Sequence, residues 1–120
     1  MNKIEEKRKR INDLQNEIEK IKEELKEIHK YESIFILNVN TTLKNYKNII
    51  EEIYKITNYY NLEDMGIKQL AYEIDHNSEG YYILINFVGD SEMVREFEKY
   101  YRTKDEILKF IVVNKGGENV

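Results

Sequence analysis

The strongest constraint on the fold is a hydrophobic period that changes repeatedly along residues 31–113. The segments 31–39, 66–74, 81–88 and 107–113 are short and rich in β-branched and aromatic residues, which is typical of strands. Residues 43–60, and a shorter segment that follows Asp90, instead place apolar side chains three or four positions apart, as on one face of a helix. The predicted order is therefore strand, helix, strand, strand, helix, strand.

Polar residues separate these segments where caps and turns are needed. Residues 40–42 offer N-caps for the first of these helices, and Asp90 and Ser91 offer them for the second. The polar stretch 75–80 ends in Gly and indicates a hairpin between the second and third strands. With two right-handed crossovers around this hairpin, the chain is predicted to adopt an α+β, ferredoxin-like β-α-β-β-α-β fold. Its four-stranded antiparallel sheet would carry both helices on one face.

The third predicted strand indicates what the other face of the sheet would expose. Its odd-numbered residues from 81 to 87 share one face and its even-numbered residues from 82 to 88 share the other, and both sets contain large apolar side chains. If both helices lie on one side, the second face presents an apolar patch to solvent. Such patches are often contact surfaces.

Residues 1–29 are predicted to form an additional long helix, from about residue 2 to residue 28. Its apolar residues alternate between spacings of three and four, which is the heptad seam of a coiled coil. The seam consists of Ile11, Leu14, Ile18, Ile21, Leu25 and Ile28. A stripe this narrow must be covered by the chain's own domain, by a second copy in a parallel or antiparallel coiled coil, or by a different partner helix. We expect self-association, giving a homodimer through this helix.

The composition argues against catalysis. The chain has no Cys, so disulfides and thiolate metal sites are excluded, and it has no Gly-rich phosphate loop. His29 ends the predicted helix, and His76 beside Asp75 is more simply interpreted as a solvated loop pair than as a metal site. We therefore predict no catalytic residue, no metal and no cofactor.

Hydropathy and charge limit the kinds of partner that the chain is expected to have. No apolar run approaches the roughly 20 residues of a membrane helix, and no secretory signal is visible, so a cytoplasmic protein without a membrane partner is expected. The net charge is −4: residues 1–30 hold nine basic and eight acidic residues, whereas residues 31–120 hold ten and fifteen. Such an acidic domain is a poor non-specific nucleic-acid binder. The basic run at residues 7–10 invites a nucleic-acid interpretation. We prefer to interpret it as a solvated basic turn of the helix, opposed by Glu5 and Glu6.

Four stretches of the chain resemble one known family, in order and with matching spacing. They are residues 30–32 (Lys-Tyr-Glu), 70–74 (Leu-Ala-Tyr-Glu-Ile), 79–87 (Glu-Gly-Tyr-Tyr-Ile-Leu-Ile-Asn-Phe) and 108–113 (Leu-Lys-Phe-Ile-Val-Val). Together they are similar to the bacterial small-subunit ribosomal protein S6 family. The resemblance covers residues 30–115, so the expected organisation is a helix at 1–29, an S6-type domain at 30–115 and a flexible tail at 116–120.

The resemblance implies a structural, non-enzymatic protein of the small ribosomal subunit that binds ribosomal RNA and the small ribosomal protein S18. Where the family commonly has Trp-Gly-Lys-Arg-Arg, residues 65–69 read Met-Gly-Ile-Lys-Gln, which keeps the glycine and one base. By position, Lys68 and Arg102 are the candidates for contacts with RNA phosphate.

Tyr81 and Tyr82 are further candidates, because aromatic faces on an open sheet can stack on the bases of single-stranded RNA. Ordinary packing of the two rings is the preferred interpretation. The acidic domain, the lost bases and the added helix leave an alternative function open. The chain would then be a diverged S6-like protein acting off the ribosome, as a dimeric interaction module or a single-strand nucleic-acid binder.

Overall fold

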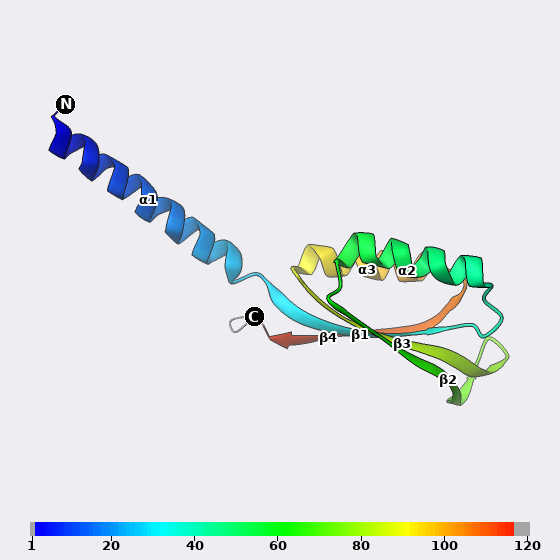
Figure 1. Cartoon of the computed structure of the whole chain (residues 1–120). Coiled ribbons are helices and arrows are strands. Elements are labelled where there is room, and N and C mark those ends of the chain that lie inside the picture. Colours follow the sequence, from blue (N-terminus) through cyan, green and yellow to red (C-terminus); the bar gives the residue numbers. More distant parts are fainter. Residues whose placement is uncertain (1, 117–120) are drawn as a thin grey trace.

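The computed structural model describes residues 2–116 and contains the six predicted elements behind an N-terminal helix (Figure 1). In chain order they are α1 (Lys3–Leu25), β1 (His29–Leu37), α2 (Leu43–Thr57), β2 (Asn61–Ile74), β3 (Asn77–Gly89), α3 (Ser91–Thr103) and β4 (Ile107–Gly116). The strands form one antiparallel sheet in the order β2-β3-β1-β4, and α2 and α3 cover the same face of it. The predicted fold class is confirmed.

Both helices of the domain begin at side chains that satisfy a free backbone N–H. The Thr42 hydroxyl accepts a hydrogen bond from the backbone N–H of Asn45 at 3.2 Å, and the Asp90 carboxylate accepts one from Met93 at 2.9 Å. Helix α2 ends at Asn58, whose φ of 49° is the left-handed conformation common just after a helix. This stop makes α2 shorter than the pattern of apolar residues predicted.

The hydrophobic core lies between the sheet and these two helices. The odd-numbered residues of β3, which the alternation placed together on one face, face inward and pack against apolar side chains of α2 and α3. Two buried hydroxyl groups in this core, those of Ser33 and Tyr101, form a hydrogen bond with each other, with 2.6 Å between their oxygen atoms. The most deeply buried side chains are Phe35, Ile53, Ile83, Ile85, Phe87 and Phe97.

Two boundaries of the central hairpin differ from the prediction. Strand β2 begins at Asn61 rather than near residue 66, because residues 61–64 pair with residues 83–86 of β3. The hairpin turn consists of Asp75 and His76 alone, whose φ values of 47° and 65° match the positive φ required at both positions of a tight type I′ turn. The stretch predicted as a loop, residues 75–80, is therefore mostly strand.

Gly80 has a packing role inside β3 instead of a turn role. A Cβ atom built on Gly80 would collide with Cγ2 of Ile36 on the neighbouring strand and would lie 3.4 Å from Cδ2 of Leu70. The missing side chain therefore leaves room for Ile36 and Leu70 to pack over this position. A glycine that the sequence presents as a turn signal is explained by a close contact between strands.

Helix α1 extends away from the domain instead of lying on it (Figure 1). It ends at Leu25, three residues before the predicted end, and His29 already pairs with Gly89 in the sheet. The connection is therefore residues 26–28, whereas the sequence left residues 29 and 30 between the predicted helix and the first predicted strand. Ile28 lies in this connection and is half-buried, so it does not continue the apolar stripe of the helix.

The C-terminal strand is also longer than expected. Strand β4 continues to Gly116, beyond the predicted end at residue 113. The remaining residues of the predicted tail, 117–120, lie outside the described residues.

Candidate functional site

The sheet face opposite α2 and α3, called here the open face, carries an apolar patch. Ile34 of β1 lies opposite Leu84 of β3 and Ile111 of β4, and Ile36 lies opposite Tyr82 and Lys109. Directly opposed residues point to the same side of a sheet, so these side chains share one surface. The apolar members of the open face are Ile34, Ile36, Leu70, Tyr72, Tyr82, Leu84, Ile111 and Val113.

The patch has a packed centre and an exposed edge. Ile36 and Leu70 are buried although no helix covers them, because they pack on each other over Gly80. Around them Tyr72 is 70% exposed and Ile111 is 50% exposed. Large apolar side chains exposed together on one face are typical of a contact surface rather than of ordinary solvent-facing strand.

Two lysines lie over tyrosine rings on this face. The Nζ atom of Lys68 is 5.8 Å from the centroid of the Tyr82 ring, and that of Lys109 is 5.9 Å from the centroid of Tyr72. Both distances are within the range of cation–π attraction, which contributes about 0.5–1 kcal/mol at exposed sites. The open face thus combines an apolar centre with positive charges held above aromatic rings.

Tyr81 does not share this surface with Tyr82. Its hydroxyl donates a hydrogen bond to the Asp64 carboxylate, and its ring meets the ring of Tyr46 on α2 edge to face, with centroids 5.7 Å apart. The hydrogen bond to Asp64 is the main cause that raises the pKa of Tyr81 above its usual value, with burial adding to it. The two tyrosines therefore lie on opposite faces of the sheet, and only Tyr82 belongs to the open face.

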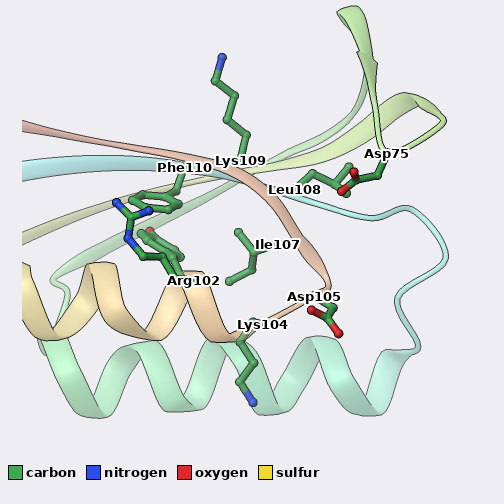
Figure 2. Close-up of a pocket in the computed structure, with 9 residues that line it drawn as sticks. Asp75, Arg102, Lys104, Asp105, Ile107, Leu108, Lys109 and Phe110 are labelled. Carbon is green, nitrogen blue, oxygen red and sulfur yellow. The ribbon is translucent and has the colours of Figure 1, made fainter.

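Arg102 lies at the other side of the domain from Lys68. It sits in the last turn of α3, and its guanidinium carbon is 5.6 Å from the centroid of the Phe110 ring on β4 (Figure 2). Figure 2 also shows Lys109 pointing away from Arg102, on the opposite side of β4. Since β2 and β4 are the two edges of the sheet, Lys68 and Arg102 form no single basic cluster.

Arg102 borders a hollow of mixed charge. Besides Arg102, the lining residues include Lys104 and Lys109 as bases and Asp75 and Asp105 as acids. The acidic groups reduce the attraction of this region for a polyanion. Arg102 is therefore suited to a single phosphate contact rather than to a continuous basic track.

The sequence did not single out Lys109, Tyr72, Leu70 and Ile36 as site residues. The alternation of Lys109, Ile111 and Val113 along β4 is a signal that places these three on one face. Their neighbours across the sheet follow only from the register, which joins segments far apart in the chain. Tyr72 on β2 and Lys109 on β4 belong to opposite edge strands, so their contact does not follow from any strand pairing.

Among residues 2–116, no three His, Cys, Asp or Glu side chains lie together in a way that could hold a metal ion. None of the helices in this part of the chain combines the length and the apolar content needed to cross a bilayer.

Comparisons with known proteins agree with this fold. The family model described as Ribosomal protein S6 matches residues 30–114, which leaves α1 outside the match. The small ribosomal subunit protein bS6 of Clostridium novyi is 36% identical over 91 residues, covering 70% of this chain and 94% of that protein. The bS6 protein of Clostridium beijerinckii is 36% identical over 94 residues, covering 72% and 97%.

A solved structure supports the same relationship. The crystal structure of 30S ribosomal protein S6 from Thermotoga maritima aligns with a TM-score of 0.68 at 31% identity, covering 73% of this chain and 88% of that protein. A match of this extent in sequence, combined with the same order of strands and helices, goes beyond a shared fold. The chain belongs to the ribosomal protein S6 family.

Proposed function

We propose that this chain is a structural protein of the small ribosomal subunit, located in the cytoplasm, that binds ribosomal RNA and the small ribosomal protein S18 and has no catalytic activity. The main support is that its domain corresponds to nearly the whole of proteins named small ribosomal subunit protein bS6, 94% and 97% of the two relatives compared above. A function carried by the whole relative therefore has its structural basis in residues 30–114.

The open face is the surface we assign to the protein partner. Its exposed apolar residues, such as Tyr72 and Ile111, lose contact with water when a partner covers them, and this burial drives association. The flanking Lys109 favours a partner segment that carries acidic or polar groups beside its apolar ones. Aromatic and aliphatic anchors surrounded by polar groups are the usual composition of a protein interface.

Contact with RNA is assigned to side chains at the margins of the domain. Lys68 and Arg102 each offer one positive charge to a phosphate, and Tyr82 offers a ring beside Lys68. Phosphate contacts position a protein on RNA without reading its sequence. The base specificity of binding would then come from the assembled subunit rather than from this chain alone.

The alternative, an S6-like protein acting off the ribosome, is favoured by the acidic domain and by α1, which lies outside the family match. It has less support, because every relative compared is a ribosomal protein matched along nearly all of its length.

Co-sedimentation tests the proposal. Tagged protein expressed in cells should appear in the small-subunit fractions of a sucrose gradient at moderate salt. Lys68→Ala should weaken this association. It should also reduce, by about one unit, the slope of the logarithm of the binding constant against the logarithm of the salt concentration. Lys99→Ala, an exposed lysine on α3, is the matched control and should leave both unchanged. Complete absence of the wild-type protein from these fractions would refute the ribosomal assignment.

The open face is tested separately. Ile111→Asp places a charge in the apolar patch and should abolish binding of purified S18, whereas Glu51→Asp on α2 should not. Unchanged S18 binding by the Ile111 variant would mean that the partner uses another surface.

A further inference from the structure

Helix α1 is an amphipathic helix whose apolar side has no cover in the structure. Its isoleucine and leucine side chains are 45–62% exposed, and none of its residues is buried. An apolar stripe of this length in water is expected to pair with another helix. The question is which helix fits it.

The charges of α1 are divided between its two halves. Residues 3–12 contain five basic and two acidic side chains, whereas residues 13–25 contain two basic and five acidic ones. A parallel pair would place basic half against basic half and acidic half against acidic half. An antiparallel pair would place each basic half against the acidic half of its partner, which is attractive at both ends.

We propose that α1 pairs with α1 of a second copy of this chain as an antiparallel coiled coil. In the alignment that best matches its charges, Ile4 of one copy faces Ile21 of the other, and Ile11 faces Leu14. Ile18 faces Lys7, whose methylene stem covers the apolar surface while its ammonium reaches water. Each of these layers occurs twice because the dimer is symmetric.

The flanking positions of this alignment are complementary as well. In each heptad, the residue just before the first of the two core positions lies beside the seam. In an antiparallel coiled coil it faces the residue at the same heptad position of the other helix. Lys3 thereby meets Glu24 and Arg10 meets Glu17, each pair twice. Within residues 2–116 none of these four side chains forms an ion pair, so the pairing breaks no interaction of the single chain.

The parallel arrangement is less favourable at the same positions. There Glu17 would meet Lys22, an attractive contact, but Lys3 would meet Arg8, and Lys7 would lie against Lys7 in the core seam. A pair of like charges facing each other in the core destabilises a coiled coil relative to the arrangements that avoid it. The antiparallel dimer also places the two S6-type domains at opposite ends, which leaves both open faces accessible. The dimer therefore leaves free the surface assigned to the protein partner, and the proposal does not depend on the proposed function.

The oligomeric state of the full chain tests whether α1 associates at all. Sedimentation equilibrium should give twice the 14.5 kDa mass of one chain at high protein concentration. Ile18→Asp together with Ile21→Asp should yield a monomer, while Asn12→Asp with Asn16→Asp, which adds the same charge on the polar side of α1, should stay dimeric. A monomeric wild-type protein at every concentration, or a dimer that survives the Ile18 and Ile21 changes, would overturn the proposal. Thermal unfolding followed by tyrosine fluorescence verifies that the domain of each variant is folded, and far-UV circular dichroism verifies its helix content.

A charge-reversal cycle tests the antiparallel sense. Arg10→Glu should raise the dissociation constant of the dimer about fivefold, since it replaces two attractive pairs by two repulsive ones. Adding Glu17→Arg should restore the constant to within about twofold of wild type. In a parallel dimer Arg10 faces Gln15, so the first change has little effect, and Glu17→Arg would turn the attractive contact with Lys22 into a repulsive one. Absence of rescue would therefore refute the antiparallel pairing.

Discussion

The buried hydrogen bond between Ser33 and Tyr101 permits a quantitative test of the core. Both residues are at most 2% exposed, and their hydroxyl oxygens are 2.6 Å apart. Tyr101→Phe keeps the ring, which stacks between Phe97 and Phe110 with centroids 4.2 and 4.3 Å away. The change therefore removes a hydroxyl with little loss of packing and leaves the Ser33 hydroxyl buried without a partner.

Leaving one buried partner unpaired costs about 1–3 kcal/mol, whereas removing the second partner as well adds little further cost. We therefore expect Tyr101→Phe and Ser33→Ala each to lower the free energy of unfolding by about 2 kcal/mol. The double variant should lose about 2 kcal/mol in total, so that the coupling energy between the two sites is also about 2 kcal/mol. For a domain of this size, each single change should lower Tm by roughly 8–16 °C.

Urea unfolding of the full chain, followed by tyrosine fluorescence, measures these energies. The chain has no Trp, and its ten tyrosines all lie between residues 31 and 101, so the signal reports the domain and is insensitive to α1. Additive effects, meaning a double variant that loses as much as the two single variants combined, would refute the hydrogen bond as a coupled pair.

Four further outcomes are expected. Gly80→Ala should destabilise the domain by about 1–3 kcal/mol in urea unfolding, because the new Cβ meets Ile36, and adding Ile36→Ala should make the Gly80 change much less costly. Gly66→Ala should cost about 1–2 kcal/mol in the same assay although nothing crowds the site, because Gly66 has a φ of 76°; a neutral result would contradict that conformation. Burial raises the pKa of Tyr101 above its ordinary value of 10.0, so its stabilising effect is fully present below about pH 10 and is lost as pH rises further. The unfolding free energy should consequently fall more steeply above pH 10 in wild type than in Tyr101→Phe. Deleting residues 1–25 should leave the Tm of the domain nearly unchanged, measured below the concentration at which the chain dimerises; a large drop would show that α1 supports the domain.

The order of elements and the division of strand residues between two faces could be predicted because both depend on local periodicity. The apolar alternation of β3 and the caps Thr42 and Asp90 are visible in the sequence, and the structure uses them as expected. The first five residues of β2, 61–65, were missed for a physical reason. Asn61, Glu63 and Asp64 have low strand propensity, and only pairing with β3 makes this segment a strand.

The candidate site shows the same limit. Lys68 and Arg102 were identified from the family resemblance, and the two tyrosines from the stacking ability of aromatic side chains on an open sheet. Where each side chain points depends on the register of the sheet, which places Tyr82 with Lys68 and turns Tyr81 toward α2. Gly80 is the clearest example, since its sequence context indicates a turn but its contacts explain it through Ile36 on another strand.

The short connection at residues 26–28 also fixes how far apart two copies of the domain can work. Three residues span at most about 10 Å, and in the antiparallel alignment the two Leu25 ends lie about 38 Å apart along the coiled coil. The dimer would therefore act as a spacer that holds its two domains at a nearly constant distance. A target with two binding sites at that separation gains from bivalent attachment, whereas sites much closer together are engaged by only one domain at a time.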